Sequence, residues 1–107
     1  MDNSQSSNEE QCAVYLKALA DPTRLRILRA LQAGPLTVSD VALSLEMDLG
    51  LVSHHLRTLY HAGLASSQRD GKYIYYSLNQ SFLNRRPRSG SLDFGCCKFQ
   101  FTDRETH

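Results

Sequence analysis

The sequence lacks features that would place it in several other classes of protein. No run of apolar residues approaches the roughly 20 needed to cross a bilayer, and the first eleven residues are polar and acidic, without the basic-then-apolar plan of a secretory signal. The chain has only three cysteines, an odd number that fits reduced thiols better than a disulfide framework. We therefore expect a cytoplasmic protein that does not bind membranes.

Enzyme motifs are also missing. The sequence contains no phosphate-binding glycine loop, no C-x-x-C, no paired-carboxylate site and no nucleophile with a recognisable base. We expect no catalytic residues and no required cofactor. A chain of 107 residues makes one domain that is marginal as a free monomer, and dimerisation would add buried surface.

The net charge is only +1, but the charges are segregated. Residues 51–90 carry six Lys or Arg against one acidic residue, whereas residues 1–50 carry four against seven. A basic segment in a nearly neutral chain is typical of a nucleic-acid-facing side.

The most informative stretch is 37–64, which predicts a helix-turn-helix. Thr37, with Asp40 three residues later, predicts a capped start for the first helix. Asp48 is a second N-cap candidate after a short turn, and Gly63 predicts the end of the second helix. The apolar residues of both helices recur at helical spacing, which predicts one buried face on each: Val38, Val41, Ala42, Leu45, Val52, Leu56 and Leu59.

The opposite face of the second helix suits a DNA major groove because its side chains are small, hydrogen-bonding or basic. An ordinary solvated helix face would show a similar pattern. The predicted DNA-contacting residues of this helix are Gly50, Leu51, Ser53, His54 and Arg57.

The segment after this helix predicts a β-hairpin around Asp70-Gly71. Arg69 and Lys72 flank its tip. A hairpin directly after a helix-turn-helix is a wing, and its basic tip is expected to contact the phosphate backbone.

Three stretches together resemble the ArsR/SmtB-type winged-helix repressors: ALADPTRLRILRAL at 18–31, VSHHLRTLYHAGL at 52–64 and RDGKYIYYSL at 69–78. The resemblance covers roughly residues 12–83. It implies a homodimeric DNA-binding repressor, commonly released from its operator by an effector. Thiolate-sensing members place two cysteines near the start of the first helix of the helix-turn-helix, but the matching residues here are Thr37 and Ser39.

The remaining segments complete the predicted organisation. We expect a disordered tail at 1–8, a winged helix-turn-helix DNA-binding domain at 9–84, a basic linker at 85–91 and a C-terminal Cys-Cys segment at 92–107. This last segment is read as a strand that docks on the partner subunit. A first helix is predicted with one apolar face, and a second starts at Asp21-Pro22 with three arginines on its more exposed side. The apolar face of the first helix comprises Cys12, Ala13, Leu16, Leu19 and Ala20.

Cys96 and Cys97, together with Cys12, predict a site for trivalent arsenic (As(III)) or another soft metal ion, because thiolates are soft ligands. Three alternatives stay open. Cys12 could simply pack in the core, adjacent cysteines in a strand would point to opposite faces, and exposed thiols could serve redox sensing. His54, His55 and His61 lack the spacing of a closed zinc site.

The sequence thus predicts a mainly helical α+β protein, a homodimeric winged helix-turn-helix that binds an operator in double-stranded DNA and represses transcription. Release by a thiol-binding ion such as arsenite is the favoured regulation. The alternatives are a redox-responsive or effector-independent regulator, or a winged helix used as a protein-interaction module.

Overall fold

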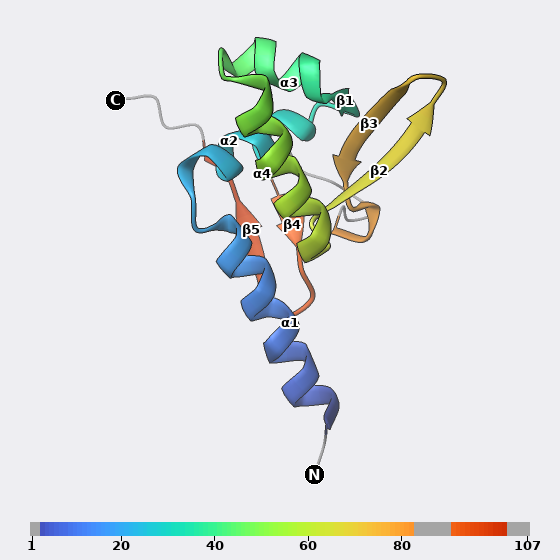
Figure 1. Ribbon diagram of the computed structural model, residues 1–107. Helices are drawn as coiled ribbons and strands as arrows, with labels where there is room; N and C mark the ends of the chain where they lie inside the picture. Colours follow the sequence, from blue (N-terminus) through green and yellow to red (C-terminus); the bar gives the residue numbers. More distant parts are fainter. Residues whose placement is uncertain (1–2, 83–90, 103–107) are drawn as a thin grey trace.

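The computed structural model describes residues 3–82 and 91–102 and has the predicted winged helix-turn-helix architecture (Figure 1). Within these two ranges, two short β-sheets accompany the helices. In chain order the elements are α1 (Asn3–Leu19), α2 (Pro22–Leu31), β1 (Leu36–Thr37), α3 (Val38–Leu45), α4 (Leu49–Ala62), β2 (Ala65–Asp70), β3 (Tyr73–Leu78), the 3-10 turn η1 (Gln80–Phe82), β4 (Ser91–Asp93) and β5 (Lys98–Gln100).

Capping residues set the helix boundaries where the sequence predicts them. The Thr37 hydroxyl accepts the Asp40 N–H at 3.1 Å, and the Asp40 carboxylate accepts the Thr37 N–H at 3.1 Å, which forms a complete capping box. Asp48 accepts the Leu51 N–H at the start of α4. Gly63 ends α4 with φ 90°, a left-handed conformation that favours glycine.

The core lies where α2, α3 and α4 meet, and its centre was predictable from helical spacing. Leu25, Val38 and Leu45 are only partly buried. The residues of these helices and the loop after α4 that have no solvent exposure are Ile27, Leu28, Val41, Val52, Leu56, Leu59 and Leu64.

Helix α1 differs from the prediction in its extent and its buried face. It begins at Asn3 inside the segment expected to be disordered, because each residue added to a formed helix gains a hydrogen bond and residues 3–8 contain no Pro or Gly. Cys12 and Leu19 point into the core as predicted. Ala13, Leu16 and Ala20 of the predicted face are exposed, Leu16 by 49%, since the helix is rotated so that Tyr15 and Ala18 pack inward.

The wing is formed by β2 and β3, which extend away from the helices (Figure 1). Its two-residue loop is Gly71-Lys72, one residue later than predicted, because Asp70 still pairs with Tyr73 and Gly71 takes the positive φ of 67°. The short strand β1 adds to β3 on the other side, and the sequence gives no signal for it.

The C-terminal segment forms a hairpin, β4–β5, rather than the single strand expected. It packs on its own chain: Leu92 has no exposure, and the Phe94 ring lies 5.2 Å from Tyr15 and 4.9 Å from Phe82. Gly95 allows the chain to reverse because it adopts φ 96°. Of the basic linker predicted at 85–91, residues 85–90 lie outside the described residues, and Ser91 already belongs to β4.

Candidate functional site

The candidate DNA interface begins with the outer face of α4, the recognition helix. Gly50, His54 and Arg57 are exposed, and Ser53 is half-buried on the same helix. Leu51 is 44% exposed close to the N-terminal end of the helix, where apolar contact with a thymine methyl group is geometrically natural.

Two features of this face were not apparent in the sequence. Leu49, the first residue of α4, is 52% exposed, so the start of the helix is less polar than the sequence indicated. Thr58 donates its hydroxyl hydrogen to the His54 carbonyl at 3.2 Å, which directs it to its own helix.

The second part of the candidate interface is the tip of the wing. Arg69 is exposed near the end of β2 and Lys72 is exposed in the turn itself, with the Lys72 ammonium 5.7 Å from the centre of the Tyr73 ring. Tyr73 is itself 53% exposed. The tip therefore combines two cations with an aromatic surface, which suits a phosphate backbone.

A polar network lies on the inner side of α4. Arg24 Nη1 is 3.2 Å from His55 Nδ1, Arg24 Nε donates to the Ala18 carbonyl at 2.5 Å, and the Arg24 N–H donates to Asp21 at 3.0 Å. The sequence indicated a solvated arginine here, but Arg24 is half-buried and joins three elements.

The same network shifts two pKa values downward. Burial is the main cause that lowers the pKa of His55 from its ordinary 6.5; Asp21 opposes this, while Arg24 and His54 reinforce it. The Arg24 backbone N–H is the main cause that lowers the pKa of Asp21, with burial acting in the opposite direction. The structure thus favours a neutral His55 and an ionised Asp21.

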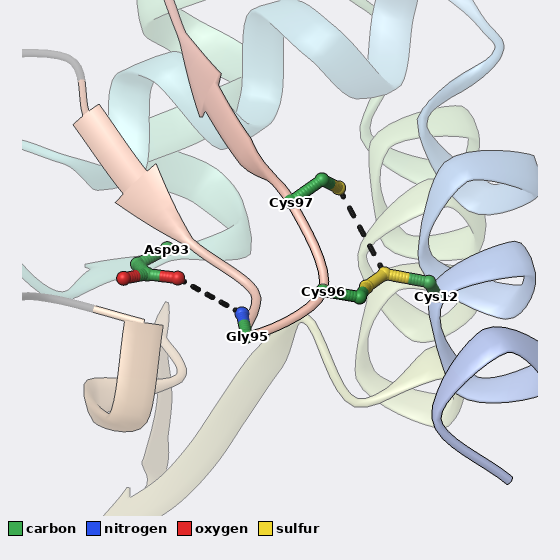
Figure 2. The surroundings of a disulfide bond; sticks show 5 residues. All are labelled: Cys12, Asp93, Gly95, Cys96 and Cys97. Carbon is green, nitrogen blue, oxygen red and sulfur yellow. Dashed lines mark hydrogen bonds between the residues drawn. A yellow bond between two sulfur atoms is a disulfide. The ribbon is translucent and has the colours of Figure 1, made fainter. Parts of the chain in front are cut away.

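Cys12, Cys96 and Cys97 converge into one thiol cluster (Figure 2). Their three sulfur atoms lie within 4.8 Å of one another. Cys12 is on the buried face of α1, and the other two are in the turn between β4 and β5. Among the side chains that the structure describes, these three are the ones grouped in a way that could hold a metal ion, and no histidine belongs to the group.

The structure differs from one expectation about these cysteines and from one of the alternatives that the sequence left open. Cys12 and Cys96 are joined in a disulfide rather than left as thiols, because docking of the hairpin on α1 brings their Cα atoms to 6.4 Å. Cys96 and Cys97 do not point to opposite faces, since they lie in a turn and not in an extended strand. Cys97 remains a free thiol, with its sulfur 3.8 Å from that of Cys12.

The positions of the turn residues explain this convergence. The Gly95 N–H donates to Asp93 Oδ1 at 2.9 Å, and the Phe94 N–H donates to the Cys97 carbonyl at 2.9 Å. These bonds close the turn, and Figure 2 shows both cysteine side chains directed toward α1.

Comparison with known proteins identifies the family to which this chain belongs. The model of the arsR family of bacterial regulatory proteins matches residues 21–67. The transcriptional repressor SdpR of Bacillus subtilis is 43% identical over 67 residues, which cover 63% of this chain and 74% of SdpR. This chain belongs to the arsR family. Family members are transcription regulators, so the chain is not an enzyme.

Other relatives have names that refer to resistance to cadmium or to arsenic compounds. A homolog of the cadmium resistance regulatory protein CadC from Staphylococcus aureus is 39% identical over 79 residues, covering 73% of this chain and 65% of that protein. An arsenical resistance operon repressor of Staphylococcus xylosus is 32% identical over 75 residues, covering 70% and 72%.

A solved structure supports the fold. The homodimeric winged helix-turn-helix DNA-binding domain of Mb0332 from Mycobacterium bovis, a possible ArsR-family regulator, superposes with a TM-score of 0.67. It is 32% identical, over 74% of this chain and 73% of that one. DNA binding and homodimerisation are typical of the family.

The family match has a limit that matters for the thiol cluster. Residues 21–67 run from the N-cap of α2 into β2 and contain none of the three cysteines. Membership therefore supports the DNA-facing half of the molecule and leaves the effector to be argued from the cluster.

None of the helices in the described ranges is long and apolar enough to span a membrane.

Proposed function

We propose that this arsR-family chain is a homodimeric repressor that binds a pseudo-palindromic operator. The main support is the exposed face of α4 with a basic wing beside it. Relatives named as repressors add to this. In each half-site α4 enters the major groove and the wing contacts flanking phosphates, with half-sites about 34 Å apart.

The direct test is fluorescence anisotropy of the reduced protein on labelled upstream DNA and on random DNA. Arg57→Ala and Ser53→Ala should each reduce the ratio of the affinity for upstream DNA to the affinity for random DNA. A lost base contact costs roughly 1–3 kcal/mol of this discrimination. Equal affinity of the wild type for both DNAs would instead favour a protein-interaction module, for which Leu49 and Leu51 offer an apolar contact.

We further propose that a soft trivalent metalloid, As(III), is the effector and that the thiol cluster holds it. Three sulfur donors within 4.8 Å suit an ion that prefers thiolates. In the reduced chain Cys12, Cys96 and Cys97 would all be available, whereas the disulfide leaves only Cys97. Relatives named for arsenical and cadmium resistance support this class of effector.

Arsenite should weaken operator binding of the reduced wild type and leave that of Cys12→Ser, Cys96→Ser and Cys97→Ser nearly unchanged. Each variant loses one of three linked donors, so its affinity for arsenite should fall at least roughly tenfold. The oxidised wild type is a matched control, since it has the same sequence and one free thiol. If arsenite does not change the affinity of the reduced wild type for the operator, this effector is excluded, whereas the DNA-binding assignment stands.

The Cys12–Cys96 disulfide supports a second candidate, a redox-responsive regulator. Two thiols and one molecule of hydrogen peroxide would give one disulfide and two molecules of water, so peroxide accepts the two electrons and two protons. Under this proposal peroxide changes the operator Kd of the wild type but not of Cys12→Ser. A dithiol reductant should restore the original Kd.

A further inference from the structure

The recognition helix is tied to the rest of the chain by one side chain that reaches two other helices. Arg24, in the first turn of α2, donates to the Ala18 carbonyl of α1 and to His55 Nδ1 of α4. Its backbone N–H is fixed by the Asp21 cap, so the base of the side chain is held in place.

The chemistry of these contacts is directional. The Ala18 carbonyl lies in the last turn of α1, where backbone acceptors lack partners within the helix and attract cations. Arginine has only donors, so His55 Nδ1 must accept, and the imidazole is then neutral with its proton on Nε2. A lysine carries one compact donor group and cannot reproduce this two-sided contact.

His55 is well placed to influence DNA reading. It lies on α4 between the exposed His54 and the buried Leu56, two residues from both Ser53 and Arg57. A helix moves as a rigid unit, so a change in how His55 is held alters the angle at which all of these side chains meet the groove.

The other end of the network leads to the thiol cluster. Cys12 and Ala18 are on the same helix, six residues or roughly 9 Å apart along its axis. Cys12 is bonded to Cys96, and Tyr15 of α1 packs on Phe94 beside the cluster. The cluster is thus anchored on α1, which packs directly on α4 and is also joined to it by the polar contacts of Arg24.

We propose that Arg24 is the positioning residue that transmits the state of the thiol cluster to the recognition helix through Ala18 and His55. This inference rests on the proposed function of the cluster as the effector site. The lowered pKa of His55 agrees with it, because a neutral imidazole is the form that accepts from Arg24. Protonation would place a second positive charge against Arg24 and beside His54, with Asp21 the one opposing charge among these groups.

The test compares Arg24→Gln with Arg26→Gln, which removes the same charge from the exposed side of α2. Arsenite binding to the reduced chains is followed by the ultraviolet absorbance of arsenic–thiolate bonds, and operator Kd is measured with and without arsenite. Arsenite should raise the operator Kd of the wild type and of Arg26→Gln by a factor of roughly 5 to 150. Arg24→Gln should bind arsenite equally well, but arsenite should raise its operator Kd by about twofold or less.

Two further variants separate positioning from folding. Arg24→Lys keeps the charge and should also lose most of the release. His55→Gln keeps an acceptor that cannot be protonated, and it should retain release while losing any weakening of operator binding between about pH 7.5 and about pH 5.5. Circular dichroism melting should show that each variant is folded at the assay temperature.

The outcomes distinguish this inference from the proposal on which it rests. Full release of a folded Arg24→Gln protein would overturn the role of Arg24 and leave the arsenite site intact. If arsenite does not bind the wild type, the comparison is repeated between disulfide and dithiol forms, where Arg24→Gln should again abolish the difference in Kd. A wild-type Kd that responds to neither arsenite nor oxidation overturns both proposals.

Discussion

His55 illustrates how the surroundings of a single side chain set its chemistry. The sequence places it next to an exposed histidine on a DNA-facing helix. The structure turns it inward against Arg24 and lowers its pKa, chiefly by burial. The two neighbours His54 and His55 therefore have different expected roles, one at the groove and one holding the helix.

At this scale the pH dependence of stability can be predicted. His55 has a folded pKa below its unfolded value, so the unfolded state binds more protons in the interval between them. Its effect is absent above about pH 6.5, and the free energy of unfolding should fall as the pH drops through that value toward the folded pKa. Urea unfolding at a series of pH values measures this.

The control for that prediction is His55→Gln, which removes the titrating group and keeps an acceptor. Its free energy of unfolding should change less over the same interval. The lowered pKa of Asp21 has a separate effect, which appears only as the pH falls below its ordinary 3.8. An identical profile for wild type and variant would show that His55 is not responsible.

At the scale of elements, caps determine where each helix of the helix-turn-helix begins. Asp48 accepts the Leu51 N–H at 3.0 Å, which satisfies a backbone donor that has no partner within α4. Asp48→Ala should therefore lower stability by about 1 kcal/mol, whereas Asp48→Asn, which also caps, should lose much less. Thermal melts of both variants measure the difference, and equal losses would mean that the charge rather than the cap matters.

The wing is an element whose contribution to DNA binding should be independent of sequence. Arg69 and Lys72 are exposed at its tip, where each can neutralise one phosphate. The double variant Arg69→Ala and Lys72→Ala should weaken binding to operator and random DNA alike. The slope of log affinity against log salt should become shallower by roughly 0.9 for each lost contact. An unchanged slope would remove the wing from the interface.

At the scale of the whole molecule, α1 is one of the elements on which a single chain leaves apolar side chains uncovered. Val14 and Leu16 are 44% and 49% exposed, one on either side of the face that α1 buries in the core. Apolar surface of this kind is stabilised when a second copy covers it. The homodimeric Mb0332 domain is consistent with such an assembly.

We predict that Leu16→Glu shifts the protein toward monomer, because a charge in an apolar contact between subunits must be desolvated. Sedimentation velocity would detect the shift, and operator binding should weaken because only one half-site is then held at a time. Gln11→Glu adds the same charge at another exposed position on α1 and serves as the control. A variant that stays dimeric would place the dimer contact elsewhere.

The sequence by itself was sufficient for the features that depend on near neighbours. The capping box at Thr37 and Asp40, the cap at Asp48 and the left-handed Gly63 are each set by contacts within a few residues. Helical spacing likewise predicted the centres of the buried faces of α3 and α4. The wing was also predicted, with its turn placed one residue too early.

Tertiary structure decided what depends on distant segments. Cys12 and Cys96 are separated by 84 residues, and they meet only because Leu92 and Phe94 anchor the hairpin in the core beside α1. Arg24 and His55 are 31 residues apart, and no pattern along the chain indicates their contact. Local spacing predicts which face of an element is apolar, but the docking of one element on another fixes which polar side chains come within bonding distance. For this protein, that docking determines both the thiol cluster and its connection to the recognition helix.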